Sequence, residues 1–286
     1  VTLAGGCIFP LVYLRQNFEV TILQSFGISA VDLRNIYSVM GLMFWITYIP
    51  SGWLADRVQP RHLMSFSLAV TGLLGIWFST YPDYDSIRMI FLGWGISTGL
   101  TFWAAMLKAV AIIARPEEQG RFFGMLDGGR GLVEAVLATI AISLFAYLIN
   151  SAGQEASEAL KRVIWFYISF VLILVPLIFF VVSDKDVEAQ TSNPLDIAVL
   201  LTDFKTLLSK QEIWLAAVCI LCGYQLFWAT YSFSAYLQVN FGLSAVTVGS
   251  ITVAKLWMRP IGATAAGFLG DRFNREKVLA LLLFFS

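Results

Sequence analysis

Several charged side chains lie deep inside apolar segments of this 286-residue chain. Asp127, Arg130 and Glu134 follow a short basic loop at residues 115–121 and are embedded in an otherwise apolar segment. Charges at such depth are costly in lipid, so they usually face a protein interior or a water-filled cavity. A guanidinium is planar, permanently charged and able to donate paired hydrogen bonds, which suits a carboxylate, phosphate or sulfonate. These residues therefore predict an anion site.

A second deep arginine is found in the C-terminal part of the chain. At a rise of about 1.5 Å per residue, Arg130 lies roughly 14 Å beyond Arg121, and Arg259 lies roughly 18 Å before Asp271. Both positions are near the middle of a bilayer. Lys255 is one helical turn from Arg259 on the same face, so we expect both cations to face a cavity. One deep arginine from each part of the chain suits a central site between two bundles.

The acidic neighbours of Arg130 allow two interpretations. Asp127, Arg130 and Glu134 are spaced three and four residues apart, so they share one helix face and could neutralise one another. A buried carboxylate beside a movable cation could also exchange a proton when that cation leaves. Asp127 and Glu134 are thus candidates for coupling to an ion, with H⁺ as the expected ion, and the pairing alternative stays open.

The composition indicates what kind of element must position these residues. Hydrophobic residues make up 58% and charged residues 13% of the chain, and the mean hydropathy is +0.75. An average soluble domain has about 25% charged residues. Several apolar runs also reach the length of about 20 residues that crosses a bilayer as a helix. We therefore predict an all-α polytopic membrane protein, with the lipid bilayer but no nucleic acid as a partner.

Nothing in the sequence indicates catalysis or a metal centre. Cys219 and Cys222 form a CxxC, but no second cysteine pair or nearby histidine accompanies it, and Cys7 is isolated. We expect these cysteines to be small core residues. No nucleophile–base pair or glycine-rich phosphate loop is found at a plausible site. We therefore predict neither an enzyme nor a cofactor.

The apolar segments predict eight helices and the start of a ninth near residue 278. A more polar segment at 184–211 separates six helices from the remainder. This predicts an N-terminal six-helix bundle at 1–183, a cytoplasmic linker at 184–211 and the first part of a second bundle at 212–286. The chain begins at Val1 and ends at Ser286 inside apolar runs, so we expect a fragment cut within two helices. The predicted helices are 1–24, 36–55, 63–81, 87–114, 122–149, 162–183, 212–238 and 244–269.

Basic residues are distributed unequally between the two sets of loops. Loops on one side, including the linker, carry ten Lys or Arg residues and those on the other side carry four. Excess positive charge marks the cytoplasmic side. We therefore expect a multi-pass protein of the cell membrane, a bacterial inner membrane, with the basic loops and the linker in the cytoplasm.

A loop motif occurs twice. The segment Gly52-Trp53-Leu54-Ala55-Asp56-Arg57 ends the second predicted helix, and Gly267-Phe268-Leu269-Gly270-Asp271-Arg272 ends the eighth. Two related halves would place the copies in this way. The aspartate and the arginines, with Arg61 in the first copy, could tether helices in one conformation and release them in another. The alternative is a simple anchor that keeps positive charge on one side.

Both segments resemble a loop of the major facilitator superfamily. The stretch GWLADRVQPRHLM matches its GxLaDrxGrrxxl pattern, and GFLGDRFNREKVL is the counterpart in the second half. Gln59 and Asn274 replace the central glycine of that pattern. The resemblance implies the major facilitator fold, with about nine of twelve helices present. It also implies a transporter that works by alternating access.

The first predicted helix resembles that of a narrower group of transporters within this superfamily. The stretch Tyr13-Leu14-Arg15-Gln16-Asn17-Phe18 is similar to the Y-x-R-x-N-F sequence of organophosphate antiporters and related organic-anion symporters, where the arginine contacts the anionic substrate. The resemblance implies that Lys108 corresponds to a basic residue in helix four and Arg130 to a substrate-contacting histidine in helix five. Tyr48 stands where those antiporters carry a lysine. The GRxFG and GRG sequences, which include Arg121 and Arg130, resemble sugar or sugar-acid permeases more closely.

Polar aromatic side chains complete the candidate site. Tyr224 and Gln225 lie near the middle of the seventh predicted helix, and Tyr48 lies in the second. Tyrosine can stack on a sugar and donate a hydrogen bond, although aromatic residues in membrane proteins often serve as interfacial anchors. Lys108 is nearer the basic loop and could extend its ammonium group to the cytoplasm instead.

We predict a secondary transporter, a symporter-type permease for a small organic anion such as a sugar acid, sugar phosphate or sulfonate. The expected substrate-binding residues are Arg15, Lys108, Arg130, Arg259, Lys255, Tyr48, Tyr224 and Gln225. Proton or other ion coupling is expected, and we expect a monomer. The alternative is a membrane receptor that binds the anion without net flux, which a flux assay beside a binding assay would distinguish.

Overall fold

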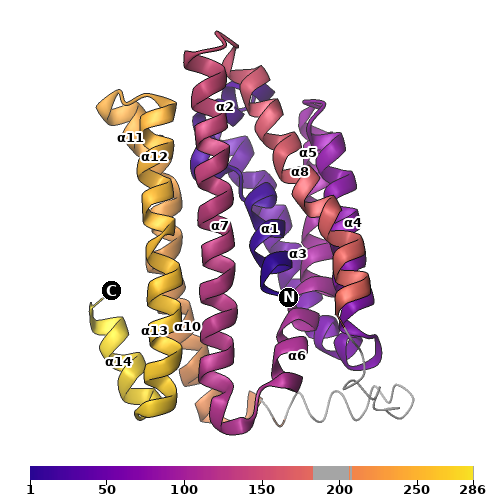
Figure 1. Ribbon diagram of the computed structural model, residues 1–286, viewed down its shortest axis with the longest axis vertical. Coiled ribbons are helices and arrows are strands. Elements are labelled where there is room, and N and C mark those ends of the chain that lie inside the picture. The colour runs from indigo at the N-terminus through magenta and orange to yellow at the C-terminus, as the bar shows by residue number, and fades with distance from the viewer. Residues whose placement is uncertain (183–205, 207, 286) are drawn as a thin grey trace.

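The computed structural model describes residues 1–182, 206 and 208–285, and within these ranges every element is helical (Figure 1). The predicted linker at 184–211 falls outside the described residues except at 206 and 208–211. The helices of the N-terminal part are α1 (Thr2–Val12), α2 (Arg15–Phe26), α3 (Ala30–Arg57), α4 (Pro60–Phe78), α5 (Tyr84–Ser97), η1 (Thr98–Phe102), α6 (Trp103–Ile113), η2 (Pro116–Glu118), α7 (Gln119–Asn150) and α8 (Ala156–Val181). The helices of the C-terminal part are α10 (Gln211–Ala229), η3 (Thr230–Ser232), α11 (Phe233–Phe241), α12 (Ala245–Leu256), α13 (Met258–Arg272) and α14 (Arg275–Phe285).

The first eight α-helices pack around one apolar core. Helix α4 lies against α8, α3 against α5, and α1 against α7. The largest completely enclosed side chains include Trp94, Tyr167 and Phe18. Trp94 also donates its indole N–H to the carbonyl oxygen of Thr71 at 3.1 Å, which pairs the polar end of a buried aromatic ring. This core holds α7 in a defined position between the other N-terminal helices and the C-terminal ones.

Within the described residues, three helices are long and apolar enough to cross a membrane by length and composition. They span Tyr84–Ile113, Gln119–Asn150 and Ala156–Val181. The segment Tyr84–Ile113 contains a π-helical turn, η1, between α5 and α6. These spans agree with the predicted helices at 87–114, 122–149 and 162–183.

Three segments predicted as single helices are each divided. The segment 1–24 breaks between α1 and α2, 212–238 breaks at η3, and 244–269 breaks at Trp257. The last break has a local cause. Pro260 lacks an N–H group and its ring crowds the carbonyl of the residue four positions earlier, Leu256, which is the last residue of α12. Arg259 consequently lies in the first turn of α13, immediately after the break.

The C-terminal helices α12 and α13 run along α7, as Figure 1 shows. Gly124 of α7 lies directly against Gly267 of α13. A Cβ atom added to Gly267 would lie 2.5 Å from the carbonyl oxygen of Gly120 and 2.8 Å from the Cα of Gly124. Only glycine permits two backbones to come so near. This contact lies toward the end of the bundle that contains the turns after α3, α6 and α13, which we call the basic end.

Candidate functional site

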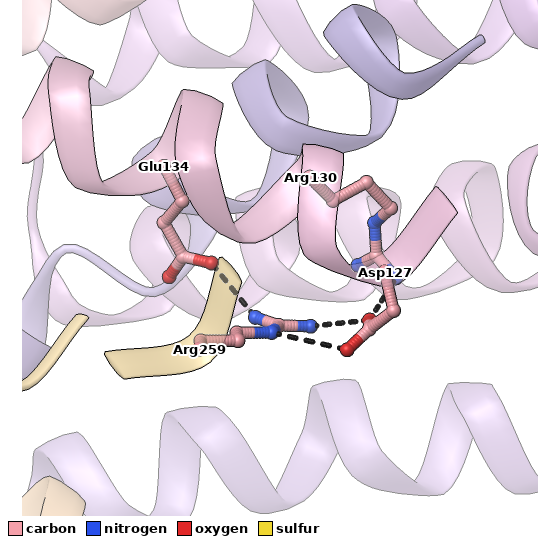
Figure 2. A network of polar contacts seen from close by, with 4 residues as sticks. All are labelled: Asp127, Arg130, Glu134 and Arg259. Atoms are coloured by element: carbon pink, nitrogen blue, oxygen red, sulfur yellow. Dashed lines mark hydrogen bonds and ion pairs between the residues drawn. The ribbon is translucent and has the colours of Figure 1, made fainter. Parts of the chain in front are cut away.

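Two carboxylates of α7 hold an arginine of α13. Arg259 donates from Nη2 to Asp127 Oδ1 at 2.8 Å and from Nη1 to Glu134 Oε2 at 2.9 Å (Figure 2). Its Nε lies 3.4 Å from Asp127 Oδ2. Arg130 joins the same group through a hydrogen bond of 3.2 Å from Nη1 to Asp127 Oδ1. We call these four residues the ion-pair cluster.

The spacing on α7 explains how one helix supplies three members of the cluster. Residues three and four positions apart lie on one helix face, so Asp127, Arg130 and Glu134 are all near the α13 interface. The predicted pairing of Arg130 with Asp127 is present, but Glu134 reaches Arg259 on the other helix. The sequence could not identify this partner, because the two residues are 125 positions apart.

Arg130 is the most deeply buried cation of the cluster, with 8% of its side chain exposed. Its guanidinium carbon lies 4.9 Å from the ring centre of Trp103 and 5.5 Å from that of Phe9. Such cation–π contacts partly replace the water that a buried cation loses. Its Nε atom, however, is buried without a hydrogen-bond partner. The site therefore contains unused capacity to bind an acceptor.

Lys255 adds a third cation near the cluster. It lies on α12, one turn before Arg259, and its Nζ donates to Thr230 Oγ1 at 2.8 Å. The same Nζ is 5.5 Å from the ring centre of Tyr231. With both carboxylates ionised, the three cations and two anions of this region carry a net charge of +1. A single negative charge would neutralise them.

Arg15 lies in a separate cavity of about 430 Å³ whose lining includes no member of the ion-pair cluster. Its guanidinium carbon is 4.2 Å from the ring centre of Tyr37, and its Nε is buried without a hydrogen-bond partner. A ring contact of 6.0 Å between Tyr13 and Tyr231 lies between this cavity and Lys255. The cavity is lined by Tyr13, Arg15, Glu19, Arg34, Tyr37, Ser38, Met40, Gly41 and Phe44.

Two residues that line the cavity were not among the predicted site residues. Glu19 stands four positions after Arg15 on α2, a spacing that brings side chains to one face and could have identified it. Arg34 precedes the predicted helix at 36–55, but it lies in the first turns of α3 and lines the cavity. Thr230 and Phe9, which contact Lys255 and Arg130, carried no sequence signal.

Lys108 contacts a motif loop. Its Nζ donates to the carbonyl oxygen of Ala55 at 2.9 Å and to Asp56 Oδ1 at 3.1 Å. Both acceptors belong to the last turn of α3, where unpaired helix carbonyls attract a cation. Lys108 thus joins α6 to the first copy of the repeated motif. Its predicted role in binding substrate remains a prediction.

The second motif copy makes a different contact. Asp271 accepts hydrogen bonds from the backbone N–H groups of Gly120 at 3.0 Å and Arg121 at 2.7 Å. Its carboxylate also lies 3.6 Å from Arg121 Nε. Gly120 and Arg121 are in the first turn of α7, where free N–H groups and the helix dipole favour an anion. This carboxylate therefore joins α13 to α7 at the basic end.

The remaining motif arginines contact aromatic rings, and the guanidinium carbon of Arg61 is 5.7 Å from the ring centre of Phe179 in α8. Arg57 packs its guanidinium 4.3 Å from the ring centre of Trp53, and Arg61 donates to Gln59 Oε1 at 3.3 Å. The guanidinium carbon of Arg272 is 5.7 Å from the ring centre of Phe273. A Cβ atom on Gly52 would meet no atom within 4 Å, in contrast to Gly267.

The predicted polar aromatic residues lie at exposed positions. Tyr48 and Tyr224 are each 50% exposed, and Gln225 is also exposed. Tyr48 stacks on Phe44 with ring centres 5.7 Å apart. Over the described ranges, no three His, Cys, Asp or Glu side chains are grouped so that they could hold a metal ion.

Apolar helices of membrane-spanning length and a buried ion-pair cluster between two groups of helices define a multi-pass helical membrane protein. The chain belongs to the Major Facilitator Superfamily, whose sequence pattern matches residues 4–286. The resemblance of the two motif loops predicted this family correctly.

Curated relatives include inner membrane proteins and a probable hexose phosphate transport protein. The chain is 29% identical over 278 residues to inner membrane protein YihN of Escherichia coli, which covers 96% of the chain and 65% of that protein. It is 29% identical over 247 residues to inner membrane protein YqcE of the same organism, covering 86% of the chain and 57% of the relative. A probable hexose phosphate transport protein of Chlamydia muridarum is 23% identical over 170 residues, 56% of the chain and 35% of the relative. The chain thus spans about two thirds of the length of YihN.

Proposed function

We propose that the full-length protein is a secondary transporter of a small organic anion, of the sugar acid, sugar phosphate or sulfonate class. The observation that carries this proposal is the ion-pair cluster with its adjacent lysine. Arg130 comes from α7 and Arg259 from α13, and together with Lys255 they leave a net positive charge at the helix interface. A buried excess cation is costly in a membrane unless an anion joins it. Binding between the two groups of helices also couples the ligand to their relative movement.

The packing of α7 and α13 supports alternating access. At the basic end the two helices are in backbone contact at Gly124 and Gly267, and Asp271 binds the first turn of α7. The cavity beside Arg15 is lined by the Arg34 to Phe44 part of α3, toward the other end of that helix. If the basic end is cytoplasmic, as the charge distribution predicts, this arrangement corresponds to a closed inner side and a cavity toward the outer side.

The membrane and the coupling ion follow from the same features. The relatives YihN and YqcE are named inner membrane proteins, which supports a bacterial inner membrane. Glu134 binds Arg259 across the interface, so its charge is linked to the contact between α7 and α13. Protonation of Glu134 or Asp127 would weaken that contact, and this is how we propose that an ion, most simply H⁺, is coupled to transport.

The test is transport by the full-length protein in membrane vesicles. The probes are labelled D-glucuronate, D-glucose 6-phosphate and 2-hydroxyethanesulfonate, which represent the three anion classes. We expect saturable uptake or counterflow of at least one probe, lost in Arg130→Ala and in Arg259→Ala. Arg15→Ala tests the cavity in the same assay.

Arg88→Ala is the matched control, because the half-exposed Arg88 forms an ion pair with Asp85 of its own helix at 3.6 Å. Uptake that is equal in the wild type, Arg130→Ala and Arg259→Ala would contradict the anion site. Saturable binding without counterflow would contradict transport.

A further inference from the structure

Asp127 occupies a position between two guanidinium groups that come from different helices. Its Oδ1 atom accepts from Arg130 Nη1 at 3.2 Å and from Arg259 Nη2 at 2.8 Å, while Oδ2 faces Arg259 Nε at 3.4 Å (Figure 2). One carboxylate thus contacts both arginines. Two nitrogen atoms of Arg259, Nη2 and Nε, face its two oxygen atoms. This is the geometry with which paired arginines bind the carboxylate of a ligand.

The four members of the ion-pair cluster differ in exposure. Asp127 has 43% of its side chain exposed, against 8% for Arg130, 13% for Glu134 and 25% for Arg259. The described helices enclose Asp127 less than Glu134, so Asp127 loses fewer packing contacts when it leaves the two arginines. The Nε of Arg130, whose side chain is nine-tenths buried, has no hydrogen-bond partner while Asp127 is in this position.

We propose that the Asp127 carboxylate occupies the place of the substrate's anionic group while no substrate is bound. When the substrate binds, its anionic group displaces the Asp127 carboxylate from between Arg130 and Arg259. This inference rests on the proposed function and assigns its recognition step. Without ligand, the Asp127 carboxylate prevents the two arginines from repelling each other across the helix interface. With ligand, the substrate anion binds both guanidinium groups, and the Asp127 side chain turns away from them.

The charge of the region then limits the charge of the substrate. Arg130, Arg259 and Lys255 against Asp127 and Glu134 leave +1, and displaced Asp127 remains part of the site. A monoanion brings the total to zero, whereas a dianion leaves an excess negative charge in a partly buried interface, which is unfavourable. The structure therefore assigns a monoanionic head group, a carboxylate or a sulfonate, in preference to a phosphate monoester, which carries about two charges at neutral pH.

The experiment measures the dissociation constants of D-glucuronate and D-glucose 6-phosphate with the purified full-length protein at pH 7.5. These probes share a pyranose ring and carry one and about two negative charges. We expect the wild type to prefer D-glucuronate by about tenfold or more. Asp127→Asn removes the competing charge and raises the total to +2, so both probes bind more tightly and the preference shifts toward D-glucose 6-phosphate. Asp127→Ala, which removes the side chain, is a second variant with the same expected direction.

Glu134→Gln is the matched control, because it makes the same change in charge and leaves Asp127 between the arginines. We expect it to tighten binding of D-glucuronate by less than Asp127→Asn does, because Asp127 still competes for the two arginines. Thermal unfolding of each variant checks that the protein is folded, and Arg130→Ala defines specific binding.

The inference would be overturned if binding depends on Arg130 but the ratio of the two dissociation constants is the same in the wild type and in both Asp127 variants. That result would leave the anion site intact. Tighter D-glucuronate binding in Glu134→Gln equal to that in Asp127→Asn would also overturn it, since charge alone would explain the effect. Failure of both probes to show Arg130-dependent binding in the wild type and in Asp127→Asn would overturn the inference together with the anion site.

Discussion

Replacing Asp271 by asparagine should open the contact between α7 and α13 at the basic end. The carboxylate is 6% exposed and accepts two backbone N–H groups of α7, from Gly120 at 3.0 Å and Arg121 at 2.7 Å. A hydrogen bond to a charged group contributes about 1.5–3 kcal/mol. Asparagine keeps one oxygen acceptor and loses the charge that favours a helix N-terminus. We therefore expect a loss of roughly 3 kcal/mol, which would favour the separated arrangement by about 100-fold.

The assay is the rate at which a small thiol reagent modifies a cysteine introduced at Thr264. Thr264 lies on α13 against Gly128 of α7, so the helix contact partly covers its side chain. The experiment uses a background without Cys7, Cys219 and Cys222, because these thiols are free. The modification rate should rise by up to about 100-fold in Asp271→Asn, as long as the open arrangement is the minor one.

Two comparisons make the result decisive. Asp85→Asn removes an exposed carboxylate that pairs with Arg88 within α5 and should leave the rate unchanged. Gly267→Ala should raise the rate, since its new methyl group separates the same two helices. If the rate in Asp271→Asn equals that of the wild type while Gly267→Ala raises it, the carboxylate does not hold the contact and the reasoning is wrong.

Three further predictions concern stability. Gly267→Ala should destabilise the protein by about 1–3 kcal/mol in a thermal unfolding assay, because the added Cβ would meet the backbone of Gly120 at 2.5 Å. Gly262→Ala is the control: its Cβ meets no atom within 4 Å, so stability should change by less than about 0.5 kcal/mol. A double-mutant cycle with Lys108→Met and Asp56→Asn should give a coupling energy below about 1 kcal/mol, because the Asp56 side chain is 68% exposed; a coupling of several kcal/mol would contradict this. Trp94→Phe should cost about 1–3 kcal/mol, since it removes a fully buried hydrogen bond and leaves a cavity, and an unchanged unfolding midpoint would show that the indole group is not required.

The local parts of the site followed from the sequence. The depth of Arg130 within an apolar segment and its spacing from Asp127 predicted a charged helix face, and α7 contains that face with the Arg130 to Asp127 contact. The repeated motif loops led to the correct family. These inferences succeeded because helix periodicity and membrane length are determined by short stretches of chain. The predicted limits 122–149 lie within three residues of those of α7, whereas α3 and α8 each begin six residues earlier than predicted.

Only the tertiary structure determined which charges meet. Glu134 was expected either to neutralise Arg130 or to couple an ion, yet its hydrogen-bond partner is Arg259 of another helix. Lys108 was assigned to substrate and contacts Asp56, and Arg15 lies beside a cavity that the ion-pair cluster does not line. Each of these outcomes depends on how helices distant in sequence pack and on where they break, as α12 and α13 do at Trp257. A charge pattern along one helix defines which face is polar, whereas the partner of each charge is decided by the packing of the whole bundle.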